Sequence, residues 1–179
     1  GFIIYPGALI EPEAYLPLAQ KISELGFKTF VIPMPFNMAI FDTDAATKVI
    51  SEYYDIEKWF IAGHSLGGSM AADFVDLHDF NIKGLILLAS YTAENTILET
   101  TPVLSITASN DEIIDDKKFK ERKNNILSES SYVSIKGGNH SQFGWYGFQE
   151  GDGKATITRD KQLLLILHEI KKFTYKHLD

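Results

Sequence analysis

Short apolar runs rich in β-branched and aromatic residues alternate along this chain with longer amphipathic stretches. This alternation is typical of parallel strands that are joined by crossover helices. It predicts an α/β fold, a three-layer α/β/α sandwich around a mainly parallel sheet of six strands. The expected strands are 2–5, 28–32, 58–62, 83–89, 102–107 and 131–135, and the expected helices are 11–25, 43–54, 66–77, 115–127 and 158–177.

The first expected helix carries one residue that disturbs it and one that ends it. Leu18, Ala19 and Ile22 are spaced for one buried face, and Gly26 stands where the helix should stop. Pro17 lies inside the segment, so its first turns are expected to be bent or irregular.

Length and composition limit the classes of protein to consider. A chain of 179 residues with 45% hydrophobic residues fits one compact domain over residues 1–179. Acidic residues outnumber Lys and Arg by 24 to 17, the net charge is -7, and no basic cluster lies among aromatic residues. Nucleic acid is therefore not an expected partner. Cysteine is absent, which excludes disulfides, thiolate metal sites and a cysteine nucleophile.

No segment of the sequence is apolar for long enough to cross a bilayer. The longest apolar runs, 85–89 and 163–167, are far shorter than the roughly 18 residues that a spanning helix needs. The chain begins at Gly1 without a methionine and runs directly into an apolar segment, so the start looks like a cut. Any signal peptide or anchor would lie upstream, and the sequence does not indicate a compartment or an oligomeric state.

The segment around Ser65 carries the strongest chemical signal. An apolar strand leads into Gly63, the pattern G-x-S-x-G follows, and small residues continue after Gly67 in the order strand, sharp turn, helix. A serine at the tip of such a turn has a strained backbone, and side chains two positions away would collide with the strand and helix. The turn predicts Ser65 as a nucleophile and the Leu66 N–H as an oxyanion donor.

The alternatives to a nucleophile turn in this segment are a chance match to the pattern and a phosphate-binding loop. G-x-S-x-G is a loose pattern that unrelated chains contain by chance, although its setting between a strand and a helix argues against that here. A phosphate-binding loop is disfavoured because neither G-x-x-x-x-G-K nor G-x-G-x-x-G is present.

A serine hydroxyl needs a neighbouring base to take its proton. The candidates are His64, His78, His140, His168 and His177. His64 adjoins the serine in sequence and is expected to point away from its hydroxyl, and three others fall on or at the ends of expected helices, where solvated roles are ordinary. His140 follows the last expected strand, on a loop at the carboxyl edge of the sheet, and is predicted as the general base.

The acid that orients the histidine should follow a strand between the serine and the histidine. Asp111 comes four residues after the strand that ends at Thr107 and fits this position. Asp115 and Asp116 are rivals, but they lie where a helix should begin, and acidic residues there often only interact with the helix dipole. The second oxyanion donor is expected to be the Ala8 N–H after Pro6 and Gly7, although an ordinary proline-glycine turn is the alternative.

At this point the sequence resembles the α/β-hydrolase superfamily, in particular its small, lid-poor, carboxylesterase-like serine hydrolases. The residues that carry the resemblance are Tyr5-Pro6-Gly7, 11–15, 63–68, Asn110-Asp111 and 137–144. The resemblance places Ser65, Asp111 and His140 on the catalytic triad, and Leu66 and Ala8 on the oxyanion hole, with no metal and no cofactor. One departure is that the early strands of the fuller family sheet are missing before Phe2.

The resemblance implies hydrolysis of a carboxylic ester, thioester or lactone through an acyl-enzyme intermediate. The alternative is a non-catalytic binding or sensor protein on the same fold. The connection 90–101 is too short for a helical cap, so a shallow site for small-molecule esters is expected. Loop residues expected to wall it are Phe36, Met38, Phe41, Tyr91, Phe143, Trp145 and Tyr146, and the long segment 137–157 is expected to be functional or disordered.

Overall fold

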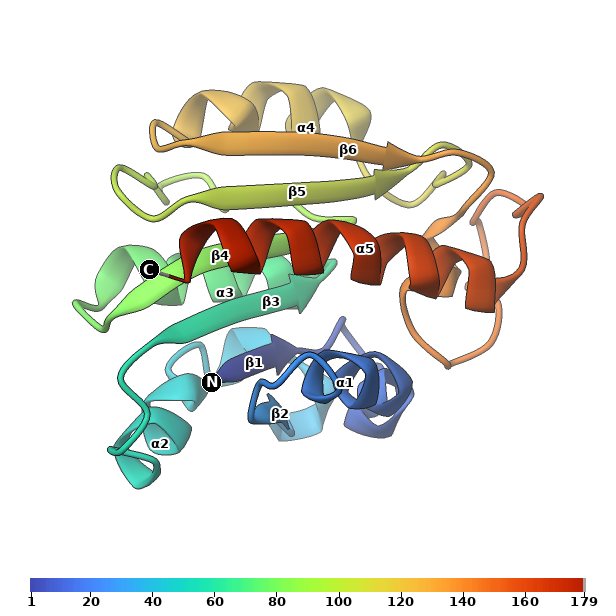
Figure 1. Cartoon of the computed structure of the whole chain (residues 1–179). Helices are drawn as coiled ribbons and strands as arrows, with labels where there is room; N and C mark the ends of the chain where they lie inside the picture. The colour runs from blue at the N-terminus through green and yellow to red at the C-terminus, as the bar shows by residue number, and fades with distance from the viewer. Residues whose placement is uncertain (179) are drawn as a thin grey trace.

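The computed structural model describes residues 1–178 and contains one six-stranded sheet with the strand order β2-β1-β3-β4-β5-β6 (Figure 1). Every neighbouring pair of strands is parallel, which confirms the predicted sheet. The strands are β1 (Phe2–Tyr5), β2 (Thr29–Val31), β3 (Trp59–His64), β4 (Ile82–Leu88), β5 (Val103–Ala108) and β6 (Ser130–Ile135).

The helices also lie where the periodicity predicted them; one of them has the predicted bounds and the others are shorter. They are α1 (Leu16–Ser23), α2 (Ala45–Glu52), α3 (Leu66–Leu77), α4 (Asp116–Arg122) and α5 (Arg159–His177). The first predicted helix is irregular, as expected: Pro12–Tyr15 forms a 3₁₀ turn, and α1 begins after it. Pro17 lies in the first turn of α1, where its missing N–H breaks no helical hydrogen bond.

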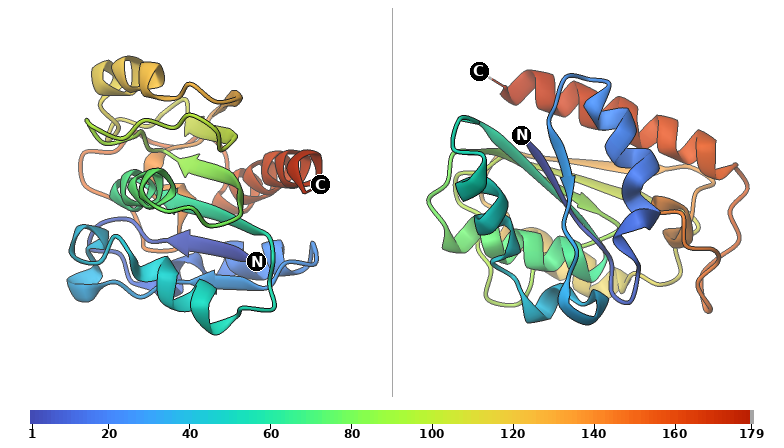
Figure 2. Two further views of the ribbon diagram at one scale, coloured as in Figure 1. Left: turned by 90° about the vertical axis from the view of Figure 1, so that its left-hand side faces the viewer. Right: turned by 90° about the horizontal axis from the view of Figure 1, so that it is seen from below.

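Helices cover both faces of the sheet (Figure 2). Phe2 and Ile4 of β1 belong to the apolar cluster that includes α1 and α5, whereas Ile3 and Tyr5 belong to the cluster that includes α2 and α3. Successive side chains of a strand point to opposite faces, so a strand buried on both sides must be apolar throughout. This is why β1 is a continuous apolar run.

The parallel arrangement brings the carboxyl ends of all six strands to one edge of the sheet, at the right of Figure 1, where the long segment 137–157 also lies. The strands differ in burial along the sheet. All six residues of the central strand β3 are buried, whereas β6 at the sheet edge buries only Ile135. The strands β3, β5 and β6 thus differ in burial along their length, although the last residue of each, His64, Ala108 and Ile135, is buried.

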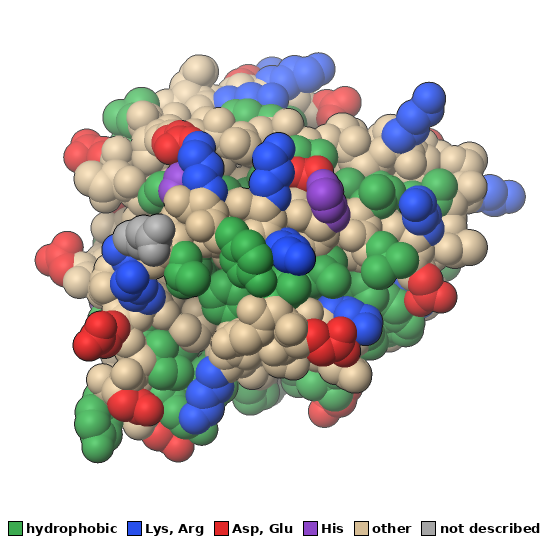
Figure 3. All heavy atoms as spheres, viewed as in Figure 1, with side chains coloured by type: hydrophobic (Ala, Val, Ile, Leu, Met, Phe, Trp, Pro, Cys, Tyr) green, Lys and Arg blue, Asp and Glu red, His purple; other side chains and the backbone are tan. Residues whose placement is uncertain are grey.

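The surface gives no sign of a continuous basic stripe on the face shown in Figure 3, where acidic and basic side chains are interspersed. None of the helices within residues 1–178 has the length and apolarity that a membrane span requires. The same residues contain no group of three or more His, Asp or Glu side chains that could hold a metal ion.

Candidate active site

Ser65 occupies a strained turn between β3 and α3. Its backbone has φ 52° and ψ -126°, in the positive-φ region that non-glycine residues rarely adopt. A Cβ atom on Gly63 would lie 2.4 Å from the Gly67 carbonyl oxygen, and one on Gly67 would lie 2.1 Å from that of Pro6. Both glycines are therefore required by close backbone approach, and the second approach places the loop after β1 against the serine turn.

His140 and Asp111 meet directly. The His140 Nδ1 lies 2.8 Å from Asp111 Oδ2, and both side chains are buried. The other carboxylate oxygen accepts the N–H groups of Ile113 and Ile114, each at 2.9 Å. An ionised carboxylate only accepts hydrogen bonds, so Nδ1 carries the proton and Nε2 presents its lone pair. The Nε2 atom has no hydrogen-bond partner among the described residues, and His140 lines the same pocket as Ser65.

The rival acids have other positions. Asp115 is the N-cap of α4 and accepts the N–H groups of Lys117 and Lys118 at 3.0 Å each. These hydrogen bonds, that from Lys118 most of all, lower the pKa of the Asp115 carboxyl. Asp116 is exposed in the first turn of α4. In the part of the chain that the structure describes, only Asp111 pairs with His140.

The other histidines lie outside this pair. His78 bonds Asp44 through Nε2 at 2.8 Å, and His168 is exposed on α5. His177 is partly exposed at the end of α5. His168 matches the solvated role predicted for it, whereas His78 packs against Phe74 and His177 packs against Phe173.

His64 is fully buried and points away from the serine, toward Tyr15, whose hydroxyl lies 2.7 Å from His64 Nδ1. Burial, and to a lesser degree the nearby His140, hold the pKa of His64 well below its ordinary value. The ring is therefore neutral and packs against the His140 ring at a centroid distance of 4.5 Å.

Tyr15 is a site residue whose contacts the sequence did not reveal. Its hydroxyl accepts the Gly7 N–H at 2.9 Å and shares a hydrogen bond of 2.7 Å with His64 Nδ1. Burial raises the pKa of Tyr15, so the hydroxyl keeps its proton. One side chain thus ties the loop after β1 to the end of β3. The only sequence signal for its role was that it ends the stretch 11–15, which carries part of the family resemblance. From sequence alone, a tyrosine next to apolar residues cannot be distinguished from an ordinary core residue.

Two backbone N–H groups, on the segments that meet at Gly67, have no hydrogen-bond acceptor among the described residues. Neither the Ala8 N–H nor the Leu66 N–H donates to an acceptor within residues 1–178. Leu66 is the first residue of α3, so its N–H has no helical partner and points from the positive end of the helix. The Ala8 N–H belongs to the loop that the Pro6 carbonyl brings against Gly67. The two donors are thus on the two segments that meet at Ser65.

A pocket of about 350 Å³ opens beside the serine and the histidine. Its apolar walls come from Leu66 and Met70 of α3, Tyr91 and Ala93 after β4, and Ile113 and Ile114 after Asp111. Asp115 is its only acidic residue, and no Lys or Arg lines it. The connection from β4 to β5 contains no helix, as its length predicted.

The predicted aromatic wall is only partly correct. Of its seven residues, Tyr91 alone lines the pocket. Phe143 is buried and stacks on His64 at 5.5 Å instead. Phe36 and Phe41 are exposed and pack edge to face with their ring centroids 5.9 Å apart. The remaining three, Met38, Trp145 and Tyr146, are half-buried outside the pocket lining.

Comparison with known proteins agrees with this architecture. Est1E from Butyrivibrio proteoclasticus, solved with ferulic acid, is 15% identical with a TM-score of 0.71 over 99% of this chain and 88% of that chain. Mouse alpha/beta hydrolase domain-containing protein 10 is 13% identical with a TM-score of 0.73, covering 98% and 90%. A Paleococcus ferrophilus monoacylglycerol lipase is 12% identical with a TM-score of 0.74, covering 96% and 94%.

At these identities the structural likeness shows a shared fold alone. Among curated proteins, none matches this chain in sequence. The model of the alpha/beta hydrolase family, however, matches residues 1–164, which is most of the chain. The strained serine turn and the order of strands and helices agree with that match, and the chain belongs to the α/β-hydrolase family.

Proposed function

We propose that this protein is a serine hydrolase that cleaves a carboxylic ester through an acyl-enzyme intermediate. The observation that carries the proposal is the division of roles on His140. Its Nδ1 is held by Asp111 at 2.8 Å, while its Nε2 has no protein partner and the residue shares a pocket with Ser65. A histidine held in this tautomer is suited to take a proton from a serine hydroxyl.

In the proposed first half-reaction, Ser65 Oγ attacks the ester carbonyl carbon as its proton passes to His140 Nε2. The tetrahedral oxyanion accepts the N–H groups of Leu66 and Ala8, which have no competing acceptor within residues 1–178. Collapse of this intermediate breaks the bond to the alcohol oxygen, and the imidazolium returns the proton to it. Asp111 stabilises the imidazolium throughout.

In the second half-reaction, water attacks the acyl-enzyme carbonyl and gives a proton to the same nitrogen. The second tetrahedral intermediate releases the carboxylic acid and restores the Ser65 hydroxyl. Protonation of His140 before substrate binds would remove the lone pair that the attack requires, so the rate should fall toward acid pH.

The pocket favours a neutral, apolar group on the substrate. It has apolar walls and no cationic side chain to pair with a substrate carboxylate. Two proteins of the same fold point to acyl compounds, since one is a monoacylglycerol lipase and another was solved with ferulic acid, a carboxylic acid. A thioester or lactone would serve the same chemistry, so all three belong in the substrate screen.

The deciding experiment combines covalent labelling with turnover. A fluorophosphonate probe should label the wild type at Ser65, and nitrophenyl acetate should be hydrolysed; Ser65→Ala should show neither. Labelling of another residue would contradict the assignment of the nucleophile. A folded wild type that neither reacts with the probe nor hydrolyses esters, thioesters or lactones would support a non-catalytic binding protein instead.

A further inference from the structure

Asp152 is a buried carboxylate outside the candidate triad of Ser65, Asp111 and His140. It lies in the long segment after β6, and only 8% of its surface is exposed. No cationic side chain pairs with it in the described part of the chain. A buried carboxylate is costly unless hydrogen bonds replace the water that it has lost. Its partners therefore reveal what the fold uses it for.

Five donors surround the two carboxylate oxygens. Asp152 Oδ2 accepts the Ser141 N–H at 2.8 Å and the Ser141 hydroxyl at 2.6 Å. Asp152 Oδ1 accepts its neighbour Gly153 N–H at 2.9 Å, and also the N–H groups of Glu112 at 3.3 Å and His140 at 3.4 Å. The three shorter bonds hold the carboxylate in place, and the two longer ones reach Glu112 and His140 on the loops that carry the candidate acid and base.

These partners belong to two separate loops. Glu112 directly follows Asp111 on the loop after β5, whereas His140 and Ser141 lie on the loop after β6. The Ser141 hydroxyl also accepts the Gln149 N–H at 2.9 Å, which ties the carboxylate to the rest of the long segment. A single side chain thus bridges the turn that carries the acid and the turn that carries the base.

We propose that Asp152 is a positioning residue for the hydrolysis proposed above. Its carboxylate fixes the two loops relative to each other, so that Asp111 Oδ2 meets His140 Nδ1. Asp152 does not line the pocket with Ser65, so it acts through the acid–base pair and not on the substrate. This inference rests on the proposed function, because positioning matters for a rate only if the pair is catalytic.

The first test is Asp152→Asn, which keeps the size of the side chain. The carboxylate offers two acceptor oxygens to its five donors, whereas the amide offers only one. We expect kcat to fall by about a hundred-fold, the loss typical of a displaced catalytic group. KM should stay close to that of the wild type, because the pocket wall is untouched. Asp160→Asn, on the exposed first turn of α5, is the matched control and should change neither constant.

The second test separates positioning from a merely structural role. In an Asp111→Asn background the pair that Asp152 supports is already broken, so adding Asp152→Asn should lower kcat little further. A loss of the same factor in both backgrounds would contradict the proposal, as would wild-type kcat in the single variant. If Asp152→Asn fails to fold, Ser141→Ala removes only one of the five donors and should give a smaller loss of kcat in the same non-additive pattern.

A readout that does not need turnover keeps this inference separate from the proposed function. The proton shared between His140 Nδ1 and Asp111 should give a resolved low-field proton NMR resonance in the wild type, which Asp111→Asn abolishes. Asp152→Asn should shift or broaden that resonance, whereas Asp160→Asn should not. An unchanged resonance would overturn the positioning role even in a protein that hydrolyses nothing, and an inactive wild type with the expected shift would overturn only the hydrolase proposal.

Discussion

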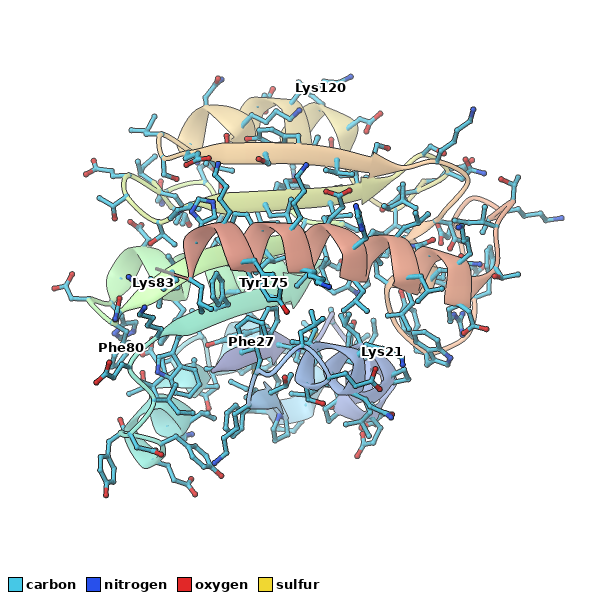
Figure 4. All side chains as sticks on the ribbon, in the orientation of Figure 1. Lys21, Phe27, Phe80, Lys83, Lys120 and Tyr175 are labelled. Carbon is cyan, nitrogen blue, oxygen red and sulfur yellow. The ribbon has the colours of Figure 1, made fainter. Side chains whose placement is uncertain are left out.

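Two hollows of the molecule lie at opposite ends of the sheet, and the larger of these two has no serine among its described lining residues. The larger, about 550 Å³, lies at the amino ends of β4 and β5 and includes Phe80, seen at the left of Figure 4 beside Lys83. Three carboxylates, those of Asp76, Asp79 and Glu99, line it together with His78, whose Nε2 is paired with Asp44. The smaller, about 350 Å³, lies at the carboxyl ends and contains a serine and a histidine.

Backbone strain separates the two ends more clearly than size does. Within residues 1–178, the non-glycine residues with positive φ are Leu9, Phe36, Asn37, Ser65 and Ala89. All five lie on segments that follow the carboxyl ends of β1 to β4. Strained residues persist only where the surroundings enforce them, and they cluster at functional sites. Parallel α/β sheets also bind ligands beyond their carboxyl ends. The comparison therefore favours the smaller hollow as the site.

The largest expected effect is the loss of kcat on removal of the proposed nucleophile in the smaller hollow. Ser65→Ala should lower kcat for nitrophenyl acetate by about a million-fold, because the acyl-enzyme route is lost. Circular dichroism and the melting temperature should show that the variant is folded. Turnover near that of the wild type would mean that the chemistry lies elsewhere, with the larger hollow as the next place to look.

The next effect concerns the acid. Asp111→Asn should lower kcat by up to about ten thousand-fold, because an amide cannot hold His140 in the required tautomer. The matched variant Asp115→Asn changes another acid of the same region, and asparagine caps helices as well as aspartate does. It should keep a far higher kcat than Asp111→Asn, because Asp115 lines the pocket but does not contact His140. If Asp115→Asn were instead the inactive variant, the acid has been misassigned.

The size of the smaller hollow sets a limit on chain length. For nitrophenyl esters, kcat/KM should rise by about four-fold per methylene while the pocket fills, given about 0.8 kcal/mol for each buried methylene. The rise should end at roughly six acyl carbons. Ile113→Ala removes part of the wall and should move the optimum to longer chains. A steady rise through about twelve carbons in the wild type would reveal a deep groove in place of a shallow pocket.

A smaller effect appears in stability. Burial holds the pKa of His64 below the unfolded-state value of about 6.5, so below that pH the unfolded chain binds a proton that the folded chain does not. The free energy of unfolding should therefore fall as pH drops below about 6.5, by at most about 1.4 kcal/mol per pH unit from this group. His64→Asn should be less stable at neutral pH but lose less on acidification. Urea unfolding of both proteins at several pH values measures the difference, and parallel curves would exclude His64 as the source.

The smallest expected effect is in the larger hollow. Asp79→Asn and Glu99→Gln change its charge without touching the carboxyl ends of the strands. Their kcat and KM for nitrophenyl acetate should match those of the wild type. A reproducible change in either constant would show that the two ends of the sheet are coupled.

The sequence was sufficient for the sheet, the helices and the serine turn because each is encoded locally. Apolar periodicity marks the strands, and the glycines around Ser65 mark the close approaches that the structure contains. The pairing of His140 with Asp111 was predicted from chain order, but Asp115 stayed a rival because both acids begin turns. Only the direction of the two side chains, which depends on tertiary packing, separates them.

The supporting residues had no such local signature. Tyr15 meets His64 across 49 positions of the chain, and Asp152 binds mostly backbone N–H groups, which every residue carries. The aromatic wall failed for a related reason. Position on a loop at the carboxyl edge does not determine whether a side chain turns inward, as Phe143 does, or outward, as Phe36 does.

The difference in burial between β3 and β6 has a consequence for how the protein loses activity when it is heated. Ser65 follows the buried central strand β3, but His140 follows β6, an edge strand that pairs only with β5 and buries one of its six residues. Edge segments open at lower free energies than core strands, so amide hydrogen exchange should be faster in β6 than in β3. Opening of that edge would part His140 from Asp111 while the serine turn stays folded. Thermal inactivation should then precede unfolding of the core and reverse on cooling.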